Sequence, residues 1–404
     1  MIDLWLYGTQ VANVHNLGSG RLRLQYAEDA IDRWGLGSRI LSVAAPLSTM
    51  PLTPAATAAI IEGLSPEGQA LDRLKASFGV RYIGELLRLL GRETVGAVVA
   101  LPEGEPLRAD EPPQTPALEE GEIAARLRGL PSTPLGVAPT TNVRLSLAGA
   151  QPKLPLTRRN AGTLHDPTFS QPSTVILKPE PSAWPRLVEL EAYGLAVMRA
   201  SGVPTPDFRI VEFDGIRVLE VDRYDRVTDS QGLITRVHQE DLCMAVGARP
   251  AAKYATSPRS DTALAKLARV VFENSRQPDQ DLATFVTALI VNIAIGNCDA
   301  HARNFSLLHF DDGSVQLAPV YDVVPTYHYR GHDRHLAQPI NANVLRPESV
   351  TQYHLQAEFD SWRVPNVRRL LETCLRAVEA ALAAVPPPEN SELRSLFAGH
   401  RVFG

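Results

Sequence analysis

The most informative stretch of this chain is Gly296-Asn297-Cys298-Asp299-Ala300-His301-Ala302-Arg303-Asn304-Phe305-Ser306. Asp299 and Asn304 stand five positions apart in it, in the pattern D-x-x-x-x-N. A carboxylate at the first position can accept the proton of an attacking hydroxyl, and an amide oxygen at the second can hold a magnesium ion. In-line phosphoryl transfer needs both groups close together, so the spacing predicts a site for that chemistry.

A second acidic residue, Asp322, follows eighteen positions after Asn304. The segment between them predicts a hairpin, with a strand over 305–310, a tight turn at Asp311-Asp312-Gly313-Ser314 and a return strand over 314–319. Such a hairpin brings Asp322 back beside Asn304, where it can share the metal. Taken singly, each residue is better explained as part of a turn or a helix cap. Together they have the spacing of a protein-kinase catalytic loop.

Composition limits the remaining choices. A chain of 404 residues can form two or three structural units. A net charge of −5 gives no global basic field for nucleic acid. No apolar run has the length of a membrane span, and the first residues lack the basic start of a signal peptide. Three widely spaced cysteines, Cys243, Cys298 and Cys374, suit a reducing cytoplasm. We therefore expect a cytoplasmic protein with no membrane contact. A redox role for Cys298 is conceivable, but burial as a small apolar residue is favoured.

The order of the predicted elements favours an α+β, bilobed protein-kinase-like fold with an extra N-terminal α/β subdomain. Short strands over 2–7, 10–16 and 22–26 precede helices over 54–64 and 81–90. A proline-rich connector and a helix over 117–130 follow. Strand-like segments then dominate to about 236, and helices such as 284–295 and 367–384 dominate to the end. The predicted domains are the subdomain 1–104, the connector 105–139, a β-rich nucleotide-binding lobe 140–235 and an α-helical catalytic lobe 236–404.

The β-rich lobe holds the candidate nucleotide contacts. Lys178 ends an apolar strand, where a lysine can pair nucleotide phosphates while a helix Glu, Glu191 or alternatively Glu189, holds it in position. The same residues also have an explanation without function. The lysine can extend from an edge strand to solvent, and the Glu can interact favourably with the dipole at the start of a helix. Small residues near 149 let backbone N–H groups approach phosphate, although the signal is weak without a G-x-G-x-x-G pattern. The main chain at 220–222 can read an adenine. The nucleotide-binding candidates are Ala148, Gly149, Ala150, Gln151, Lys153, Lys178, Glu220, Val221, Asp222 and His301. Residues 238–241 either brace the catalytic loop or begin a solvated helix.

These segments resemble a known family. Ser-Leu-Ala-Gly-Ala-Gln at 146–151, His-Gln-Glu-Asp at 238–241, the stretch at 296–306 and Ala-Pro-Val-Tyr-Asp at 318–322 look like HipA, the serine/threonine kinase toxins of bacterial toxin–antitoxin systems. Stretches at 62–68 and 96–104 match the N-terminal part of that family. The resemblance covers nearly the whole chain in order, and its most specific part is the motif at 296–306.

The resemblance implies roles for single residues. Asp299 is the catalytic base, Asn304 and Asp322 are the magnesium ligands, Lys178 contacts phosphate, and Ser146 matches a serine that is autophosphorylated and inactivates the enzyme. The segment 147–153 matches a phosphate-covering loop, in which Pro152 removes one N–H donor. Arg303 stands where the family commonly has a Lys. The compact ammonium charge is thus replaced by a planar guanidinium, which would alter a phosphate contact by this residue but keep its positive charge. The resemblance also implies ATP and Mg²⁺, a small helix-turn-helix antitoxin of the HipB type through which DNA is bound, and an aminoacyl-tRNA synthetase as the protein substrate.

Three functions remain open on the sequence. The first is an ATP-dependent protein kinase that acts as a growth-arresting toxin. The second is a small-molecule kinase of the same fold, which the sequence does not separate from the first because the acceptor contacts lie outside the motifs. The third is a non-catalytic corepressor that bridges antitoxin and DNA. The intact set of Asp299, Asn304 and Asp322 argues against the third, since a scaffold needs no metal-binding residues.

Overall fold

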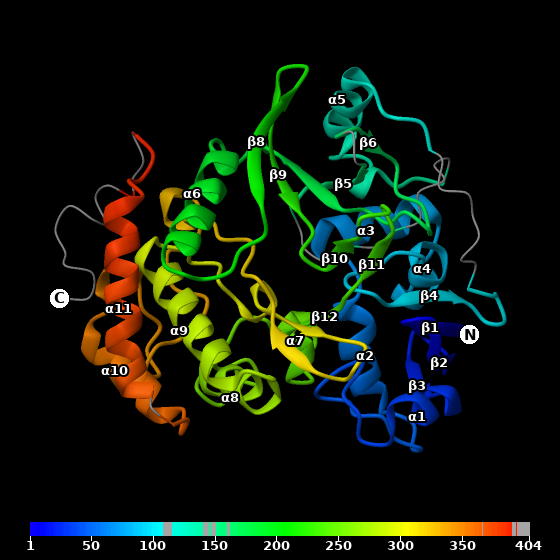
Figure 1. Cartoon of the computed structure of the whole chain (residues 1–404), viewed down its shortest axis with the longest axis horizontal. Helices are drawn as coiled ribbons and strands as arrows, with labels where there is room; N and C mark the ends of the chain where they lie inside the picture. Colours follow the sequence, from blue (N-terminus) through cyan, green and yellow to red (C-terminus); the bar gives the residue numbers. More distant parts are fainter. Residues whose placement is uncertain are drawn as a thin grey trace. The chain divides into compact units, whose positions relative to one another are not determined.

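The computed structural model describes residues 1–107, 115–139, 145, 147, 151–159, 162–365, 367–389 and 393. Its contacts divide the chain into two units, and Figure 1 labels their elements. The first unit comprises Met1–Glu180, Asp207–Glu240 and Leu308–Ser314. The second comprises Pro181–Pro206, Asp241–Leu307 and Val315–Gly404. The predicted domain boundaries remain predictions.

The first unit begins with a four-stranded antiparallel sheet in the order β3-β2-β1-β4. Its strands are β1 (Ile2–Leu6), β2 (Thr9–Asn16), β3 (Leu22–Tyr26) and β4 (Val99–Pro102), and helices α1 (Glu28–Trp34), α2 (Pro54–Gly63), α3 (Gly68–Phe78) and α4 (Ile83–Leu90) follow β3. Helix α2 starts where the Thr53 hydroxyl accepts from the Ala56 N–H and Pro54 takes the first helical position. Gly91 ends α4, and a Cβ there would lie 2.6 Å from the Ala100 carbonyl oxygen. This glycine therefore permits close packing of α4 on β4.

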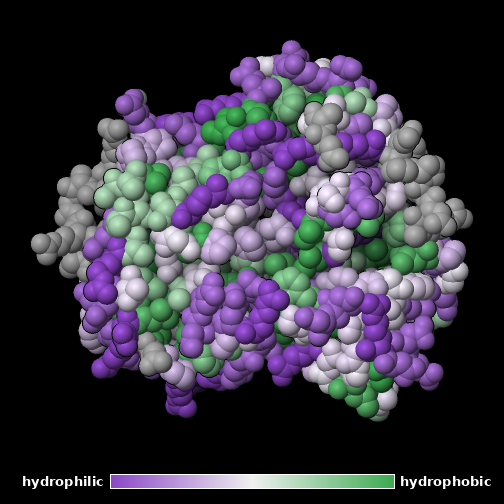
Figure 2. Space-filling view, viewed as in Figure 1, coloured by the Kyte–Doolittle hydropathy of each residue, from purple (hydrophilic) through white to green (hydrophobic). Residues whose placement is uncertain are grey.

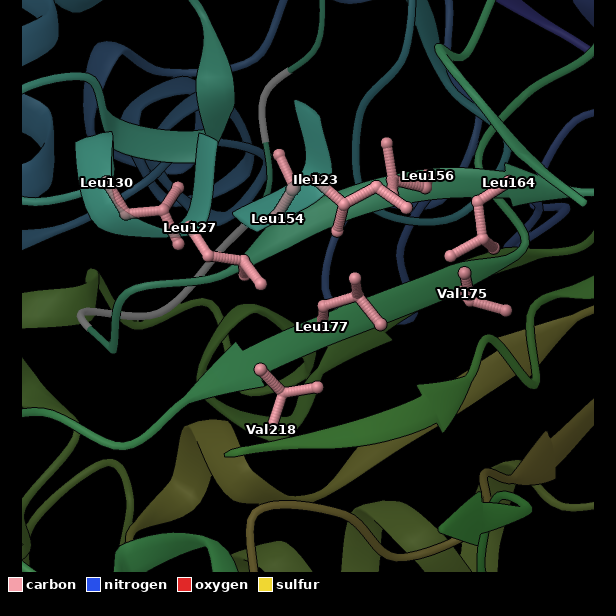
Figure 3. Packing of buried hydrophobic residues seen from close by; sticks show 9 residues of the cluster. All are labelled: Ile123, Leu127, Leu130, Leu154, Leu156, Leu164, Val175, Leu177 and Val218. Carbon is pink, nitrogen blue, oxygen red and sulfur yellow. The ribbon is translucent and has the colours of Figure 1, made fainter. Parts of the chain in front are cut away.

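A five-stranded antiparallel sheet in the order β6-β5-β7-β9-β8 forms the other part of the first unit. The elements here are α5 (Glu120–Gly129), the 3₁₀ turn Pro134–Gly136, β5 (Leu154–Arg158), β6 (Leu164–His165), β7 (Val175–Pro179), β8 (Phe208–Phe213), β9 (Ile216–Asp222), β10 (Arg226–Thr228) and β11 (Ile234–Arg236). Figure 3 shows Leu156, Leu177 and Val218 of the sheet in one buried cluster with Ile123 and Leu127 of α5. Side chains alternate along a strand, so burial of Leu177 in this cluster turns Lys178 to the opposite face.

The second unit is mainly helical. Its helices are α6 (Leu187–Ala200), α7 (Leu242–Ala245), α8 (Leu264–Asn274), α9 (Pro278–Ala294), α10 (Gln352–Ser361) and α11 (Val367–Ala384), with 3₁₀ turns at Pro250–Ala252, Ala302–Asn304, Thr326–His328 and Pro347–Ser349. Three further strands of the chain, β12 (His238–Asp241), β13 (Ser306–His309) and β14 (Val315–Leu317), form a sheet in that order, and only part of β12 and β13 belongs to the second unit. Helices α9 and α11 pack side by side (Figure 1). The buried Asp281 of α9 accepts from the Leu317 N–H at 2.6 Å, which fixes β14 to the start of α9.

No helix in the described ranges is both long and apolar enough to cross a membrane. On the face drawn in Figure 2, hydrophobic residues form separate patches among hydrophilic ones rather than a continuous band.

Candidate active site

The stretch 296–306 leaves the end of α9 through a left-handed turn. Gly296 has φ +72°, a conformation that suits glycine. Asn297 then braces the turn, because its main-chain N–H donates to the Asn292 carbonyl at 2.8 Å and its Nδ2 donates to Asn292 Oδ1 at 2.8 Å. Asn297 Oδ1 in turn accepts from the Asp299 N–H at 3.1 Å. The start of the loop is therefore held by buried amide groups.

Asp299 and Asn304 are brought together, as their spacing predicts. The Asp299 carbonyl oxygen accepts from the His301 N–H at 2.8 Å and from Asn304 Nδ2 at 2.9 Å. Because the Asn304 amide nitrogen is fixed in this way, its orientation is set and its oxygen is the acceptor end left for a metal. Asn304 is buried and Asp299 is half-buried. The loop thus presents a carboxylate and an amide oxygen from a single rigid turn.

The predicted hairpin follows this loop. The Phe310 N–H donates to the Ser314 carbonyl at 2.9 Å across the turn, and Gly313 in it has φ +81°. On the return strand, the Ala318 N–H donates to the Ser306 carbonyl at 2.8 Å.

The returning chain reaches the catalytic loop at Tyr321. Its hydroxyl donates to the Arg303 carbonyl at 2.9 Å and lies 2.6 Å from Ser306 Oγ. These two contacts lie on either side of Asn304 in the sequence. Asp322 is the next residue and is half-exposed, with a φ of +59° that is uncommon for a residue with a side chain. The hairpin therefore returns the Asp322 segment to the Asn304 turn, and strained backbone of this kind gathers at functional sites.

The charges at 238–241 brace the loop at Asp241. Its carboxylate accepts from Arg303 Nε at 2.7 Å, and both side chains are buried. The same carboxylate caps α7 by accepting from the Met244 N–H at 2.9 Å. The Arg303 guanidinium is thus engaged with the carboxylate of Asp241. In the first unit, the buried Glu240 accepts from the Val43 N–H and contacts His309 Nε2, each at 2.8 Å.

Tyr254 is a site residue that sequence reasoning missed. Its hydroxyl donates to Asp299 Oδ1 at 2.6 Å, and its ring packs edge-on against the buried His301 with centroids 5.1 Å apart. Tyr254 lies 45 positions before Asp299 in an irregular segment, and no motif marks it.

Cys298, beside the candidate base, is a packing residue. It is 4 % exposed, and burial raises the pKa of its thiol to about 12. Its main-chain N–H donates to Thr326 Oγ1 at 2.9 Å. A thiol held protonated in this way is a poor nucleophile, so burial is the better of the two explanations offered by the sequence.

The donor set fits magnesium rather than a structural metal. The described residues contain no group of three or more His, Cys, Asp or Glu that could hold a metal ion. Mg²⁺ is commonly held by one or two carboxylates together with nucleotide phosphates and water. One amide oxygen from Asn304 and one carboxylate from Asp322 match that pattern.

Apart from His301, which lies in the second unit, the described candidate nucleotide residues lie in the first unit. Lys178 is 8 % exposed on β7, and Glu220 on β9 is 2 % exposed. Glu220 is an ion-pair partner of Arg158 and of Arg209. Asp222 also pairs with Arg158, at 2.9 Å, while burial raises the pKa of Asp222.

Strand β9 corrects one expectation about the adenine contact. It is an interior strand, where Glu220 pairs with Leu177 of β7 and with Arg209 of β8. The main chain of Glu220 and Val221 is therefore used by the sheet, and the Asp222 N–H donates to the Asp207 carbonyl at 2.8 Å. A main-chain contact with adenine at Glu220 or Val221 would require breaking the hydrogen bonds that pair β9 with β7 and β8. The chain leaves the ladder after Asp222.

The remaining predicted residues divide into described and undescribed ones. Ser146, Ala148, Gly149 and Ala150 lie outside the described residues, while Gln151 and Lys153 are half-buried just before β5. In the second unit, Glu191 of α6 is 1 % exposed. Glu189 instead pairs with Arg186 at 2.8 Å near the surface. The alternative partner for Lys178 is thus already engaged, and the pairing of Lys178 with Glu191 stays a prediction.

Comparison with known proteins shows the family of this chain. Residues 2–101 match the HipA N-terminal domain family, and residues 145–384 match the HipA-like C-terminal domain family. Y4mE of Sinorhizobium fredii, which carries the name of a kinase, is 32% identical over 95% of this chain and 91% of its own length. The serine/threonine-protein kinase toxin HipA of Shewanella oneidensis is 28% identical over 86% of this chain and 83% of its own.

A solved structure has a similar fold. The Shewanella oneidensis MR-1 complex of HipA, HipB and operator DNA contains a chain that matches with a TM-score of 0.78 at 25% identity, over 98% of this chain and 94% of that one. The fold and the loop define a kinase with a bilobed α+β architecture, as predicted. The chain belongs to the HipA family.

Proposed function

We propose that this chain is an ATP-dependent serine/threonine protein kinase that acts as the toxin of a toxin–antitoxin pair. One observation supports the proposal above the others. A single turn joins Asn304 to the Asp299 carbonyl at 2.9 Å, and Tyr321 returns the Asp322 segment to that same turn. A base and two metal ligands are the groups that phosphoryl transfer requires of the catalytic lobe.

In the proposed reaction, the acceptor hydroxyl attacks the γ-phosphorus and gives its proton to Asp299. The bond from the γ-phosphorus to the bridging oxygen breaks, and ADP leaves. Asn304 and Asp322 would hold Mg²⁺, which would supply positive charge to neutralise the transferred phosphoryl group. Lys178, with Glu191 as its supporting acid, and residues 148–153 contact the phosphates. His301, which is buried and lies close to Asp299 in the sequence, is a further proposed nucleotide contact.

Labelled ATP tests the catalytic assignment. The full chain, incubated with cell lysate and γ-labelled Mg·ATP, should transfer label, and Asp299→Ala or Asp322→Ala should lower the rate about 10²- to 10⁴-fold. Asp279→Ala is a matched control, because Asp279 is an exposed residue at the start of α9. Wild-type transfer by the Asp299→Ala protein would refute the assignment.

The proposed substrate is an aminoacyl-tRNA synthetase, so identification of the labelled lysate protein tests that step. The proposed regulation is autophosphorylation of Ser146. A phosphate there adds nearly two negative charges and can capture nearby N–H groups or Lys153, which would hold the loop away from ATP. Mass spectrometry should find phosphate on Ser146 in the wild type and not in Asp299→Ala. An ATP affinity that is equal in the modified and unmodified proteins would rule out the switch.

The proposed partner is a small helix-turn-helix antitoxin of the HipB type, through which the chain binds operator DNA. The solved relative was crystallised as a HipA, HipB and operator DNA complex. This chain itself carries a net charge of −5, which disfavours direct binding to the negatively charged DNA. Mobility shifts of the DNA upstream of the gene should therefore require a small helix-turn-helix protein of this type. Specific binding by the lone chain would overturn this part of the proposal.

A further inference from the structure

The side chain of Asp299 is held more loosely than its main chain. Its N–H and its carbonyl oxygen make three hydrogen bonds, to Asn297, His301 and Asn304. Among the residues that the structure describes, its carboxylate receives one hydrogen bond, from the Tyr254 hydroxyl at 2.6 Å. The contact that sets the direction of the candidate base therefore comes from outside the catalytic loop.

The segment around Tyr254 is docked on that loop. The Lys253 carbonyl accepts from the Ala302 N–H at 3.2 Å, and the Tyr254 ring packs edge-on against His301. One residue earlier, the Ala252 carbonyl accepts from Thr262 Oγ1 at 2.7 Å, and the Lys253 ammonium lies 5.3 Å from the Tyr254 ring centroid. Tyr254 is nevertheless 44 % exposed. Asp299 is half-buried, so this pair of side chains is open in part to solvent, as a site that receives an acceptor hydroxyl must be.

We infer that Tyr254 is a positioning residue for phosphoryl transfer, an inference that rests on the proposed kinase function. Its hydroxyl holds Asp299 Oδ1 and leaves Oδ2 to face the acceptor hydroxyl. Without it, the carboxylate would rotate among several side-chain conformers. Fewer of these would meet the acceptor proton in line, and small losses of alignment are costly in such reactions. The acceptor proton passes to Asp299, and Tyr254 keeps its own proton throughout.

Removal of the single hydroxyl tests this role. In the full chain, Tyr254→Phe should lower label transfer from saturating γ-labelled Mg·ATP into lysate protein about 10- to 150-fold, the scale of one hydrogen bond to a charged group. Binding of a fluorescent ATP analogue should be unchanged, because Tyr254 is assigned to the base and not to the nucleotide. Tyr353→Phe is the matched control, since Tyr353 is 72 % exposed on α10 and no described residue hydrogen-bonds its hydroxyl. In the Asp299→Ala protein, Tyr254→Phe should cause no further loss of rate.

Three results would overturn the inference. An unchanged rate would show that the hydroxyl is dispensable, a faster rate would show that it blocks the base, and label on Tyr254 itself would make it an acceptor. A fourth measurement needs no catalysis: the effects of Tyr254→Phe and Asp299→Ala on the unfolding midpoint should be non-additive, because both remove the same hydrogen bond. Additive effects would show that the contact is not made, even if the wild type transferred no phosphate. Loss of the proposed function and loss of this inference are therefore separable.

Discussion

At the residue scale, the position of Asp322 depends on a glycine in α6. A Cβ built on Gly194 would lie 2.0 Å from the Val323 carbonyl oxygen, a distance that no packed structure tolerates. Gly194→Ala must therefore push Val323, and with it the neighbouring Asp322. We expect this substitution to lower phosphoryl transfer at least tenfold through loss of the metal site, and to destabilise the second unit by about 1–3 kcal/mol through overpacking. The labelled-ATP assay and urea unfolding measure the two effects.

Gly121→Ala is the matched control. Gly121 also lies in a helix, α5, but a Cβ added to it would meet nothing within 4 Å. Alanine there should raise stability by about 0.5–1 kcal/mol, because it is the better helix former, and leave transfer unchanged. Wild-type transfer by Gly194→Ala would show that the Asp322 segment does not depend on this contact.

Sequence reasoning succeeds at this scale where the chemistry is local. Asp299 and Asn304 occupy one turn, so their spacing alone predicts that they meet. Tyr254 is beyond such reasoning, because its place beside Asp299 is created by the packing of a distant irregular segment. The adenine expectation at Glu220 and Val221 was wrong in detail for a related reason. The sequence pattern of a strand does not reveal that β9 pairs with another strand along both of its edges.

At the element scale, a buried ion pair joins the catalytic loop to the start of α7. Arg303 and Asp241 are 2.7 Å apart, with side chains 3 % and 9 % exposed. Arg303→Ala leaves the Asp241 charge buried without this partner, so we expect a loss of about 3–5 kcal/mol in unfolding free energy. Urea unfolding of the full chain measures it.

An exposed pair provides the control for this prediction. Lys266 and Asp261 are 2.9 Å apart, but their side chains are 44 % and 71 % exposed. Lys266→Ala should cost less than about 1 kcal/mol, because water screens the pair. Equal losses in the two variants would mean that burial does not set the strength of the Arg303 pair.

The predicted boundaries of helices and strands agree best with the structure where the apolar periodicity extends over many residues. Helix α11 begins and ends at the predicted residues, Val367 and Ala384. Helix α9 starts at Pro278, six residues before the predicted start, because proline and acidic residues in its first turn extend it. Strand β4 was not predicted. It has four residues, and its hydrogen bonds come from β1, which is far away in the sequence. Periodicity cannot detect an element whose stability comes from such a partner.

At the scale of the first unit as a whole, a buried ionic cluster joins distant parts of the sequence. Asp225 and Glu93 contact Arg223 and Arg226, with all four side chains at most 5 % exposed. Burial alone would raise the pKa of Asp225, but the two arginines lower it to about 2, below its ordinary 3.8. The pKa of Glu93 is lowered in the same way. An acid whose pKa is lower in the folded state than in the unfolded state stabilises the fold at pH values above its unfolded pKa. That contribution is lost as the pH falls through its folded pKa.

We therefore expect the urea midpoint to fall between about pH 4.5 and pH 2, with Asp225 contributing roughly 2 kcal/mol. Asp225→Asn should be less stable at neutral pH, and its midpoint should change less across that window. Unfolding curves at several pH values, compared between the two proteins, measure the difference. Parallel pH dependences would show that Asp225 titrates normally in the folded chain.

The same cluster bears on whether residues 1–104 can fold alone. Glu93 needs Arg223, and Leu74, Leu86 and Leu90 of α3 and α4 share one apolar cluster with Leu135, Val137, Leu145 and Leu147. Cutting after residue 104 exposes the faces of those leucines, each of which gains about 1.5–3 kcal/mol from burial. It also leaves Glu93 without its arginines. Since a domain of this size has only a few kcal/mol to lose, we expect the isolated 1–104 fragment to lack a cooperative thermal transition by circular dichroism, whereas the full chain shows one. A sharp transition with native helix content in the fragment would mean that the sheet β3-β2-β1-β4 and helix α2 are a sufficient core, and that the shared leucine cluster adds little.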